Sequence, residues 1–207
     1  MAIRLPESGS KIACKYISNP VLLKIPEIAG GGVKFDVRYI LLVRSLRPLK
    51  LYVHRIFWLR FANRPYSLKE LDDYQTHLTV INYRANNHIR EMDYETFLQL
   101  YHEQYQQHPW SEIETKIFQM FRELFHCATM KEPPLGIGSC SASRALYAAD
   151  LILESTDNNG IQPKLLEVNF TPDCPRASTY YPNFYNQIFN ALYRDLIDTQ
   201  DILDISN

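Results

Sequence analysis

Glycine is scarce in this chain, and so are the phosphate-binding loops that depend on it. Seven of the 207 residues are glycine, and the single glycine run, at residues 30–32, lacks the GxxxxGK[ST] spacing of a P-loop. No GxSxG segment is present, and the six histidines do not form HExxH. A Walker-type nucleotide site, a serine-hydrolase elbow and a helical zinc site are therefore excluded.

Cysteine is also sparse, and its four positions show no metal-binding or disulfide pattern. No CxxC pair occurs, and no histidine stands at zinc-finger spacing from a cysteine. Free thiols are typical of a reducing compartment, which favours the cytoplasm or the nucleus. No apolar run approaches the length of a membrane helix, about 18 residues, and residues 1–20 lack the apolar core of a signal peptide. We therefore expect neither membrane insertion nor secretion.

Net charge is nearly absent, since the chain carries −1 at neutral pH. The molecule as a whole therefore gives no electrostatic indication of a partner. Its length favours one domain with a full core, to which 14 tyrosines and 10 phenylalanines contribute much of the volume. We expect a loose leader over residues 1–10, one domain over residues 11–197 and an acidic tail over residues 198–207 that frays.

Positive charge is nevertheless concentrated in residues 34–64. This segment holds eight lysine and arginine residues and one acid, Asp36, which gives it a charge of +7. Lys34–Ser45 begins by alternating charged and apolar residues, a pattern that predicts a strand with one packed face and one charged face. A cationic face suits phosphate or an acidic polymer, and the alternative is an ordinary solvated surface. Nucleic-acid binding is disfavoured because no stacking aromatic motif accompanies the charge.

Two apolar segments each carry a carboxylate where a core residue is expected. Ala145–Glu154 contains Asp150, Pro163–Phe170 contains Glu167, and a polar turn between the segments predicts a β-hairpin. Asn169 follows Glu167 by two residues, so both side chains share one face of the strand. An unpaired buried charge costs roughly 3–5 kcal/mol. The three oxygen ligands suit Mg²⁺ or Mn²⁺, and the alternative is that the two acids pair with core arginines.

The remaining periodicity predicts an α+β fold in which helices pack on an antiparallel sheet. Besides the strand over Lys34–Ser45 and the hairpin, strands are expected over residues 14–23 and 49–61. Helices are expected over residues 67–75, 94–106, 111–130 and 181–197. The third helix begins with a capping box, formed by Ser111 and Glu114. Its apolar positions have helical spacing and are expected in the core: Ile113, Ile117, Phe121, Leu124, Phe125 and Ala128.

Several segments occur in the order and spacing of one known family. CKYISNP, KFDVRYILLV, LRFANRPYS, HLT and the pair AADLILE and KLLEVNFTPDC resemble the tubulin–tyrosine ligase-like proteins, which have an ATP-grasp fold. The resemblance covers about residues 11–195, and KFDVR together with LLEVN is specific to the family. It implies that the chain holds the central and C-terminal portion of an ATP-grasp domain.

The resemblance implies a nucleotide site built from two segments. The first is a hinge that would contact the adenine of ATP through Lys15, Tyr16 and Ile17. The second is the start of the charged strand, where Lys34 and Asp36 would line the nucleotide and acceptor site.

The resemblance also implies catalytic and metal-binding residues. Arg38 and Arg60 match the arginines that steady phosphate or an acyl-phosphate. Asp150, Glu167 and Asn169 match the ligands of Mg²⁺. Together these residues would provide what phosphoryl transfer needs, namely ligands for a metal ion and cations that bear the developing charge.

The family reaction activates a carboxylate with ATP and couples it to an amine, which adds an amino acid to a tubulin tail. Because these tails are rich in glutamate, they are a second target for the cationic segment. We expect an ATP- and Mg²⁺-dependent ligase-like protein that acts on or binds tubulin tails in the cytoplasm, with the nucleus as a further location.

Two departures from the family pattern favour an alternative. Most active members have asparagine directly after HLT, whereas Asn82 comes two residues late, about 7 Å along a strand. Cys14 stands where glutamine is usual. The alternative is a catalytically inactive protein that keeps its nucleotide pocket for regulation or interaction. Because an ATP-grasp fold clamps nucleotide between two halves, we expect this portion alone to be inactive.

Overall fold

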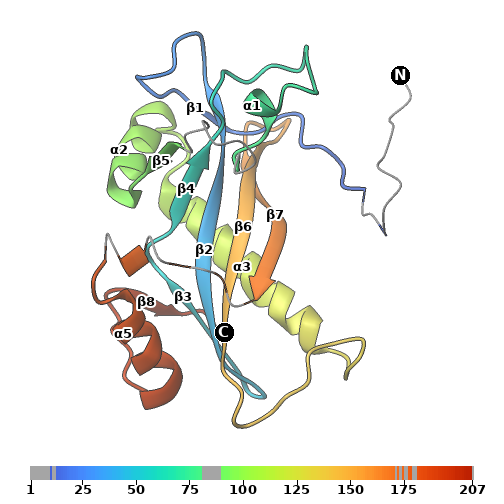
Figure 1. Cartoon of the computed structure of the whole chain (residues 1–207), viewed down its shortest axis with the longest axis vertical. Coiled ribbons are helices and arrows are strands. Elements are labelled where there is room, and N and C mark those ends of the chain that lie inside the picture. Colours follow the sequence, from blue (N-terminus) through green and yellow to red (C-terminus); the bar gives the residue numbers. More distant parts are fainter. Residues whose placement is uncertain are drawn as a thin grey trace.

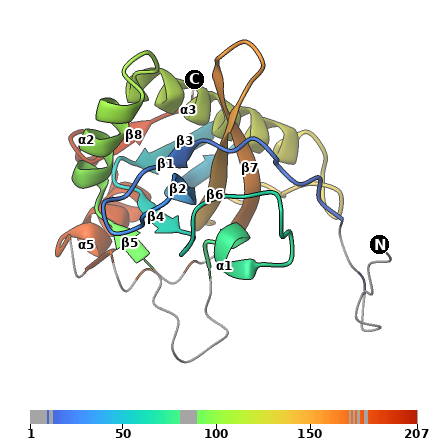
Figure 2. The same ribbon diagram turned by 90° about the horizontal axis from the view of Figure 1, so that it is seen from above.

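A long antiparallel sheet forms the centre of the structure (Figure 1). The computed structural model describes residues 10, 13–80, 90–170, 172, 174, 177–178 and 181–206. Within these ranges the sheet has eight strands, and helices cover both of its faces (Figure 2). The predicted α+β class is therefore confirmed.

Strand β2 (Val33–Leu46) organises the sheet, because its length lets it pair with four other strands. On one side β4 (Trp58–Phe61) pairs with its first half and β3 (Leu49–His54) with its second half. On the other side it pairs with β6 (Ala145–Ser155), and β1 (Leu22–Leu23) pairs at its start. The predicted strand over residues 34–45 is thus confirmed.

Three further strands complete the sheet. β5 (Arg90–Met92) pairs with β4, and β7 (Ile161–Phe170) pairs with β6 as the predicted hairpin. β8 (Ile202–Asp204) pairs with β3. The expectation that residues 198–207 fray is therefore wrong for this part of the segment. The backbone N–H of Leu51 also donates to Ser206 Oγ at 3.0 Å, and both Ile205 and Ser206 are buried.

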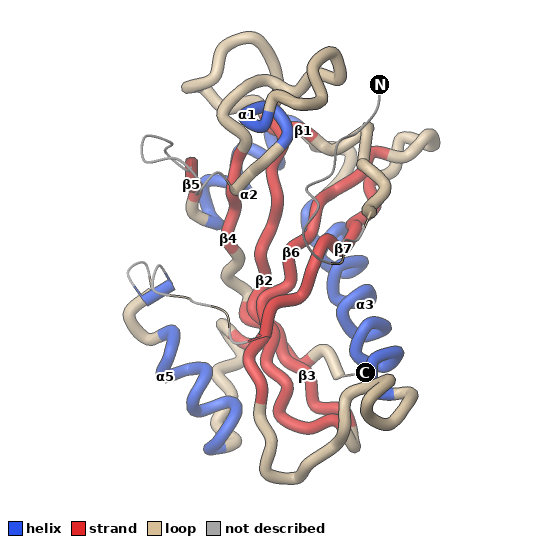
Figure 3. The backbone as a smooth tube through the Cα atoms, turned by 45° about the vertical axis from the view of Figure 1, so that its right-hand side comes forward, coloured by secondary structure: helices blue, strands red, loops and turns tan. Residues whose placement is uncertain are grey.

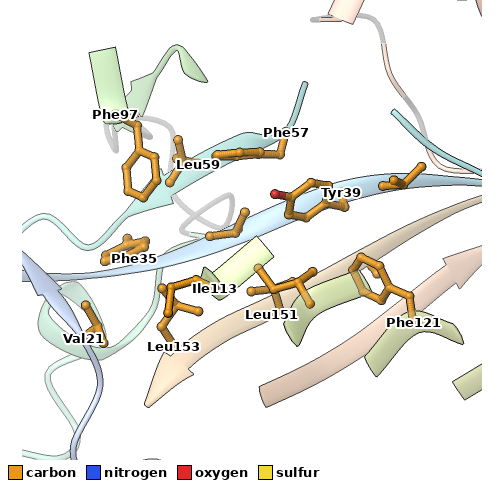
Figure 4. Close-up of a cluster of buried hydrophobic side chains, with 14 of the residues drawn as sticks. Val21, Phe35, Tyr39, Phe57, Leu59, Phe97, Ile113, Phe121, Leu151 and Leu153 are labelled. Atoms are coloured by element: carbon orange, nitrogen blue, oxygen red, sulfur yellow. The ribbon is translucent and has the colours of Figure 1, made fainter. Parts of the chain in front are cut away.

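One face of the sheet is covered by α2 (Tyr94–Gln104) and α3 (Trp110–Thr129), as Figure 2 shows. The odd positions of β2 point into this core and are all buried: Phe35, Val37, Tyr39, Leu41 and Val43. Figure 4 shows their aromatic and aliphatic neighbours. The predicted stripe on α3 supplies Ile113, Ile117, Phe121 and Phe125, which are fully buried there.

The opposite face is covered by α5 (Phe184–Phe189) and the π-helical turn η1 (Asn190–Arg194). Ile40 and Leu42 of β2 are buried against this second core. The second half of β2 is therefore buried on both faces, whereas the sequence predicted one packed face and one charged face. The short helix α1 (Tyr74–His77) contacts β2 nearer its start.

Several predicted elements are shorter than expected. Residues 13–17 have no regular structure, because the chain joins the sheet only from Asn19, whose carbonyl accepts from Ser155 N–H. The strand over residues 49–61 is interrupted at residues 55–57, which separate β3 from β4. The helix over residues 67–75 begins only at Tyr74, where Asp73 caps it, and that over residues 181–197 covers residues 184–194.

The predicted capping box of α3 is wrong. The helix begins at Trp110 after Pro109, and no side-chain hydrogen bond caps it. Glu114 instead accepts a hydrogen bond from Tyr39 Oη at 3.1 Å. In the described part of the chain, no helix is both long enough and apolar enough to cross a bilayer.

Candidate functional site

The predicted catalytic residues lie on the face of β2 opposite α2 and α3, in the first half of the strand. Arg60 of β4 stands opposite Asp36 in the strand register, and Asp150 of β6 stands opposite Arg38. Directly opposed residues of an antiparallel pair project to the same face of the sheet. The register of three strands therefore assembles these four side chains into one group, called here the charged cluster.

The charged cluster is held together by a continuous set of ion pairs. Arg38 donates from Nε to Asp150 Oδ1 and from Nη2 to Oδ2, both at 2.6 Å. Arg60 donates from Nε to Asp36 Oδ1 at 2.8 Å, and its Nη2 lies 3.0 Å from Asp150 Oδ2. The two aspartate side chains are 3% and 4% exposed, so they are buried acids that these arginines compensate. For Asp150 the arginine alternative is therefore observed.

The two aspartates of the cluster have different environments. Burial raises the pKa of Asp36 and outweighs the opposing effects of Arg60 and Thr79. Burial acts on Asp150 in the same direction, but the hydrogen bonds and charges of Arg38 and Arg60 outweigh it and lower the pKa of Asp150. Asp150 is thus firmly ionised, whereas Asp36 holds a proton more readily.

The segment His77–Thr79 is joined by hydrogen bonds to Asp36 of the charged cluster and to the neighbouring Lys34. Thr79 Oγ1 donates to Asp36 Oδ2, and Lys34 Nζ donates to the backbone carbonyl of His77 at 2.9 Å. The sequence pointed to HLT as a family segment without giving its residues roles. The structure shows that Thr79 holds the carboxylate oxygen of Asp36 that Arg60 leaves open.

Tyr16 joins this segment to the predicted hinge. His77 Nε2 donates to the carbonyl of Glu70 at 2.9 Å, so His77 Nδ1 is the acceptor for Tyr16 Oη at 2.6 Å. Lys34 Nζ lies 4.8 Å from the centroid of the Tyr16 ring, and burial lowers the pKa of Lys34.

Of the other predicted hinge residues, Lys15 is exposed and Ile17 is half-buried. Neither is bonded to the charged cluster in the part of the chain that the structure describes. The predicted nucleotide set is thus only partly assembled, around Tyr16, Lys34 and Asp36.

Glu167 and Asn169 extend the cluster to the edge strand β7. Glu167 stands opposite Asp150 in the register, and Asn169 Nδ2 donates to Glu167 Oε1 at 2.9 Å. The pKa of Arg38 is raised, first by its hydrogen bond to Asp150 and also by the charge of Glu167. The three predicted metal ligands therefore lie along one side of Arg38.

These residues fit a magnesium ion by the chemistry of their donors. An ionised carboxylate offers about four lone-pair positions, and the arginines use three of those on Asp150. One position on Asp150 remains, together with Oε2 of Glu167 and the amide oxygen of Asn169. Magnesium favours such oxygen ligands, although its other ligands are commonly waters and substrate phosphates. Among the described residues, no group of three or more acids, histidines and cysteines forms a metal site by itself.

The cationic segment is less cationic in the fold than in the sequence. Five of its eight cations form ion pairs with acids: Arg38, Arg44, Arg47, Arg60 and Arg64. The partners of Arg44, Arg47 and Arg64 are Asp195, Glu132 and Asp73, which lie outside the segment. The positive charge of the predicted cationic face is therefore largely neutralised. Asn82, the displaced asparagine, lies outside the described residues.

Comparison with known proteins identifies the family. Residues 2–204 match the tubulin-tyrosine ligase family. The chain belongs to this family. Its α+β sheet is accordingly the ATP-grasp-like fold that the tubulin-tyrosine ligase family shares, as the sequence predicted.

Individual relatives within the tubulin-tyrosine ligase family differ in similarity. The chain is 46% identical over 201 residues to tubulin–tyrosine ligase-like protein 12 of Mus musculus, covering 95% of this chain and 31% of the mouse protein. It is 39% identical over 203 residues to the Caenorhabditis elegans protein of the same name, covering 98% and 30%. Tubulin glycylase 3E of Tetrahymena thermophila is 28% identical over 178 residues, covering 83% and 12%. The chain thus spans less than a third of the length of these relatives.

Proposed function

We propose that the chain functions in an ATP- and Mg²⁺-dependent ligase-like protein that joins an amino acid to the acidic tails of tubulin. The observation that carries this proposal is the charged cluster of Asp36, Arg38, Arg60 and Asp150, which β7 extends toward Glu167. Relatives named tubulin glycylase and probable tubulin polyglutamylase support a substrate of this kind. We place the action in the cytoplasm, where exposed thiols such as Cys14, Cys127 and Cys140 stay reduced.

In this proposal Glu167, Asn169 and the remaining lone pair of Asp150 would hold the metal ion. Bound ATP and Mg²⁺ would supply the phosphoryl group that activates a carboxylate. Arg38 keeps three of its five N–H donors after binding Asp150, and its side chain is 25% exposed, so it can donate to phosphate oxygens. Arg60 is more buried and positions Asp36 and Asp150 relative to each other.

A second candidate is a nucleotide-binding protein without ligase activity. It is favoured by the closure of the cluster on itself, because Arg38 and Arg60 already engage both oxygens of Asp150. Such a cluster stabilises the fold whether or not a substrate is bound. In this candidate the pocket serves regulation or interaction with tubulin.

Thermal unfolding of the full-length protein that contains this chain, with and without MgATP, tests nucleotide binding. At ten times its Kd, a ligand stabilises the folded state by about 1.4 kcal/mol, so bound MgATP should raise Tm. Glu167→Gln should abolish the rise because it removes a charged metal ligand. Glu154→Gln on the same hairpin should retain it, since Glu154 pairs with Lys164 at the surface. No rise in the full-length parent protein would contradict both candidates.

Incorporation of labelled tyrosine, glutamate or glycine into tubulin separates the two candidates. For the full-length protein that contains this chain, the ligase proposal predicts ATP-dependent incorporation of at least one of the three. Arg38→Lys should reduce it because lysine cannot make the paired contact with Asp150. Nucleotide binding without incorporation would support the inactive candidate instead.

A further inference from the structure

A cavity of about 360 Å³ lies at the edge of the sheet, where β3 bends into β4. Its volume is within the range of small-molecule sites, about 300–1,000 Å³. In Figure 1, α2 and α5 lie above and below this bend, and Figure 3 shows the same two helices along the β4 side of the sheet. None of the predicted site residues lines the cavity. Its polar and aromatic lining comprises Arg55, Tyr94, Glu95, Tyr181, Asn183, Gln187 and Asp201.

The floor of the cavity is fixed by hydrogen bonds that begin at the fully buried His54. Its Nδ1 accepts from the backbone N–H of Ile56 at 3.2 Å, so its Nε2 carries the proton toward Gln187 Oε1 at 3.4 Å. Gln187 Nε2 in turn donates to Asp201, and the carbonyl of Asp201 accepts from Arg55 N–H at 2.8 Å. Three separate parts of the chain are thereby held together, so the cavity is formed before any ligand arrives.

Acidic side chains outnumber cations around the cavity. Among the described residues, Glu95 and Asp201 line it together with a single cation, Arg55, and no lysine. Burial raises the pKa of Tyr181, and the charges of Glu95 and Asp93 raise it further, as expected where the local potential is negative. The charge of Arg55 also interacts with Glu114 in the protein interior. It lowers the pKa of Glu114, although the larger effect of burial raises that pKa.

The partial positive charge at the start of α2 does not offset the excess of acidic side chains around the cavity. The first turn of a helix attracts anions through its unpaired N–H groups. Here Asp93 caps the helix, with its carboxylate accepting from the backbone N–H of Thr96 at 2.8 Å and from the Thr96 hydroxyl at 2.7 Å. The partial positive charge of the helix is thus already paired, and Glu95 remains available to a ligand.

Aromatic rings complete the lining. Tyr94 is the first residue of α2, Tyr181 precedes α5, and Pro182 adds a further apolar surface. The face of an aromatic ring attracts a cation, and its carbon skeleton accommodates methylene groups. From these features we propose that the cavity binds a primary alkylammonium group, with the amine near Glu95 and Asp201 and the alkyl chain between the tyrosines. This inference is independent of the nucleotide site.

Three probes of equal length test the charge that the cavity selects. Titration of the ¹⁵N-labelled full chain with n-pentylamine, 1-pentanol and pentanoate, followed by amide NMR shifts, should show saturable shifts at Arg55–Ile56 and Tyr94–Glu95 with the amine alone. Equal binding of 1-pentanol would show a merely apolar cavity, and stronger binding of pentanoate would show an anion site at Arg55. Either result, or no saturable shift with the amine, overturns the proposal.

Two variants with opposite expected effects sharpen the test. Glu95→Gln should weaken pentylamine binding by about twofold to fivefold, the usual worth of one exposed charge contact. Arg55→Gln should strengthen it by a similar factor, because it removes the one repulsive charge among the described lining residues. Glu103→Gln, on the same helix but outside the cavity, should change nothing. An unchanged affinity in Glu95→Gln would also overturn the proposal.

A final comparison identifies the natural source of the amine. 1,5-Diaminopentane represents a free polyamine, and Nα-acetyl-L-lysine amide represents the lysine side chain of a protein. The probe that binds more tightly to the parent chain and loses more affinity in Glu95→Gln indicates the source. If neither probe binds and pentylamine does not bind either, the proposal is overturned.

Discussion

On the face of β2 that meets α2 and α3, five successive odd positions are apolar and buried. The opposite face begins with Lys34, Asp36 and Arg38 and continues with the apolar Ile40 and Leu42. The same strand therefore supports two kinds of interior. The first is stabilised by area removed from water, about 25 cal/mol per Å². The second requires each buried acid to keep its arginine, since an unpaired buried charge is costly.

The two interiors should respond differently to mutation. Loss of one apolar side chain leaves a cavity whose effect stays local. Loss of one arginine removes contacts from two aspartates on different strands, because Arg60 reaches both Asp36 and Asp150. The comparison can be tested on both faces.

The largest effect is expected on the apolar face. Phe121 is fully buried, and its ring packs against Tyr39 with centroids 5.8 Å apart. Phe121→Ala should lower the free energy of unfolding by about 4 kcal/mol, measured by urea denaturation. Phe189→Ala is the matched control, because Phe189 is 55% exposed and its loss should change stability by less than about 0.5 kcal/mol.

A slightly smaller effect is expected from Arg60→Met on the charged face. The substitution keeps an unbranched side chain but leaves two buried carboxylates with fewer partners, which should cost about 3 kcal/mol. Arg64→Met removes an exposed pair with Asp73 and should cost at most about 1 kcal/mol. Equal losses in the two variants would show that the charged cluster is no more than surface pairing.

The smallest effects are expected in the pH dependence of the two aspartates, and they have opposite signs. The pKa of Asp36 is raised, so its contribution to stability is present below its unfolded pKa of about 3.9 and is lost as pH rises through its folded pKa. The pKa of Asp150 is lowered, so its contribution is present above about pH 3.9 and is lost as pH falls through its folded pKa.

Urea denaturation between pH 3 and 7 should therefore separate Asp36→Asn from Asp150→Asn. Relative to the parent chain, Asp36→Asn should gain stability as pH rises and Asp150→Asn should lose it. Each slope is at most about 1.4 kcal/mol per pH unit. Parallel curves for the two variants would mean that the aspartates share one environment.

The sequence was sufficient where the signal is local. The alternation of Lys34–Ser45, the 3.6-residue spacing of α3 and the turn between β6 and β7 each lie within about 20 residues, and all three elements were predicted correctly. The predicted capping box was wrong because the carboxylate of Glu114 accepts a hydrogen bond from the buried hydroxyl of Tyr39, which is 75 residues away in sequence. The predicted strand over residues 14–23 was too long because the chain pairs with the sheet only from Asn19-Pro20 onward.

The candidate site was predictable as a set of residues but not as a set of partners. The motifs around Arg38 and Glu167 predict the candidate side chains, and the strand register brings Arg38, Asp150 and Glu167 together. The choice between metal ligand and ion-pair partner for Asp150 depends on the register of β2 and β6, which brings together residues 112 apart in sequence. The same holds for Arg44, whose partner Asp195 is 151 residues away. Local patterns contain no information on such distant pairings.

The pairing of β3 with β8 has a consequence for biosynthesis. Leu51 of β3 contacts Ser206, which is 155 residues further along the chain. At a synthesis rate of roughly 5–20 residues per second, β3 waits roughly 8–30 s for its partner after it has been made. During that interval its open edge can pair with other nascent chains. This edge of β3 therefore stays exposed to such pairing until β8 has been made.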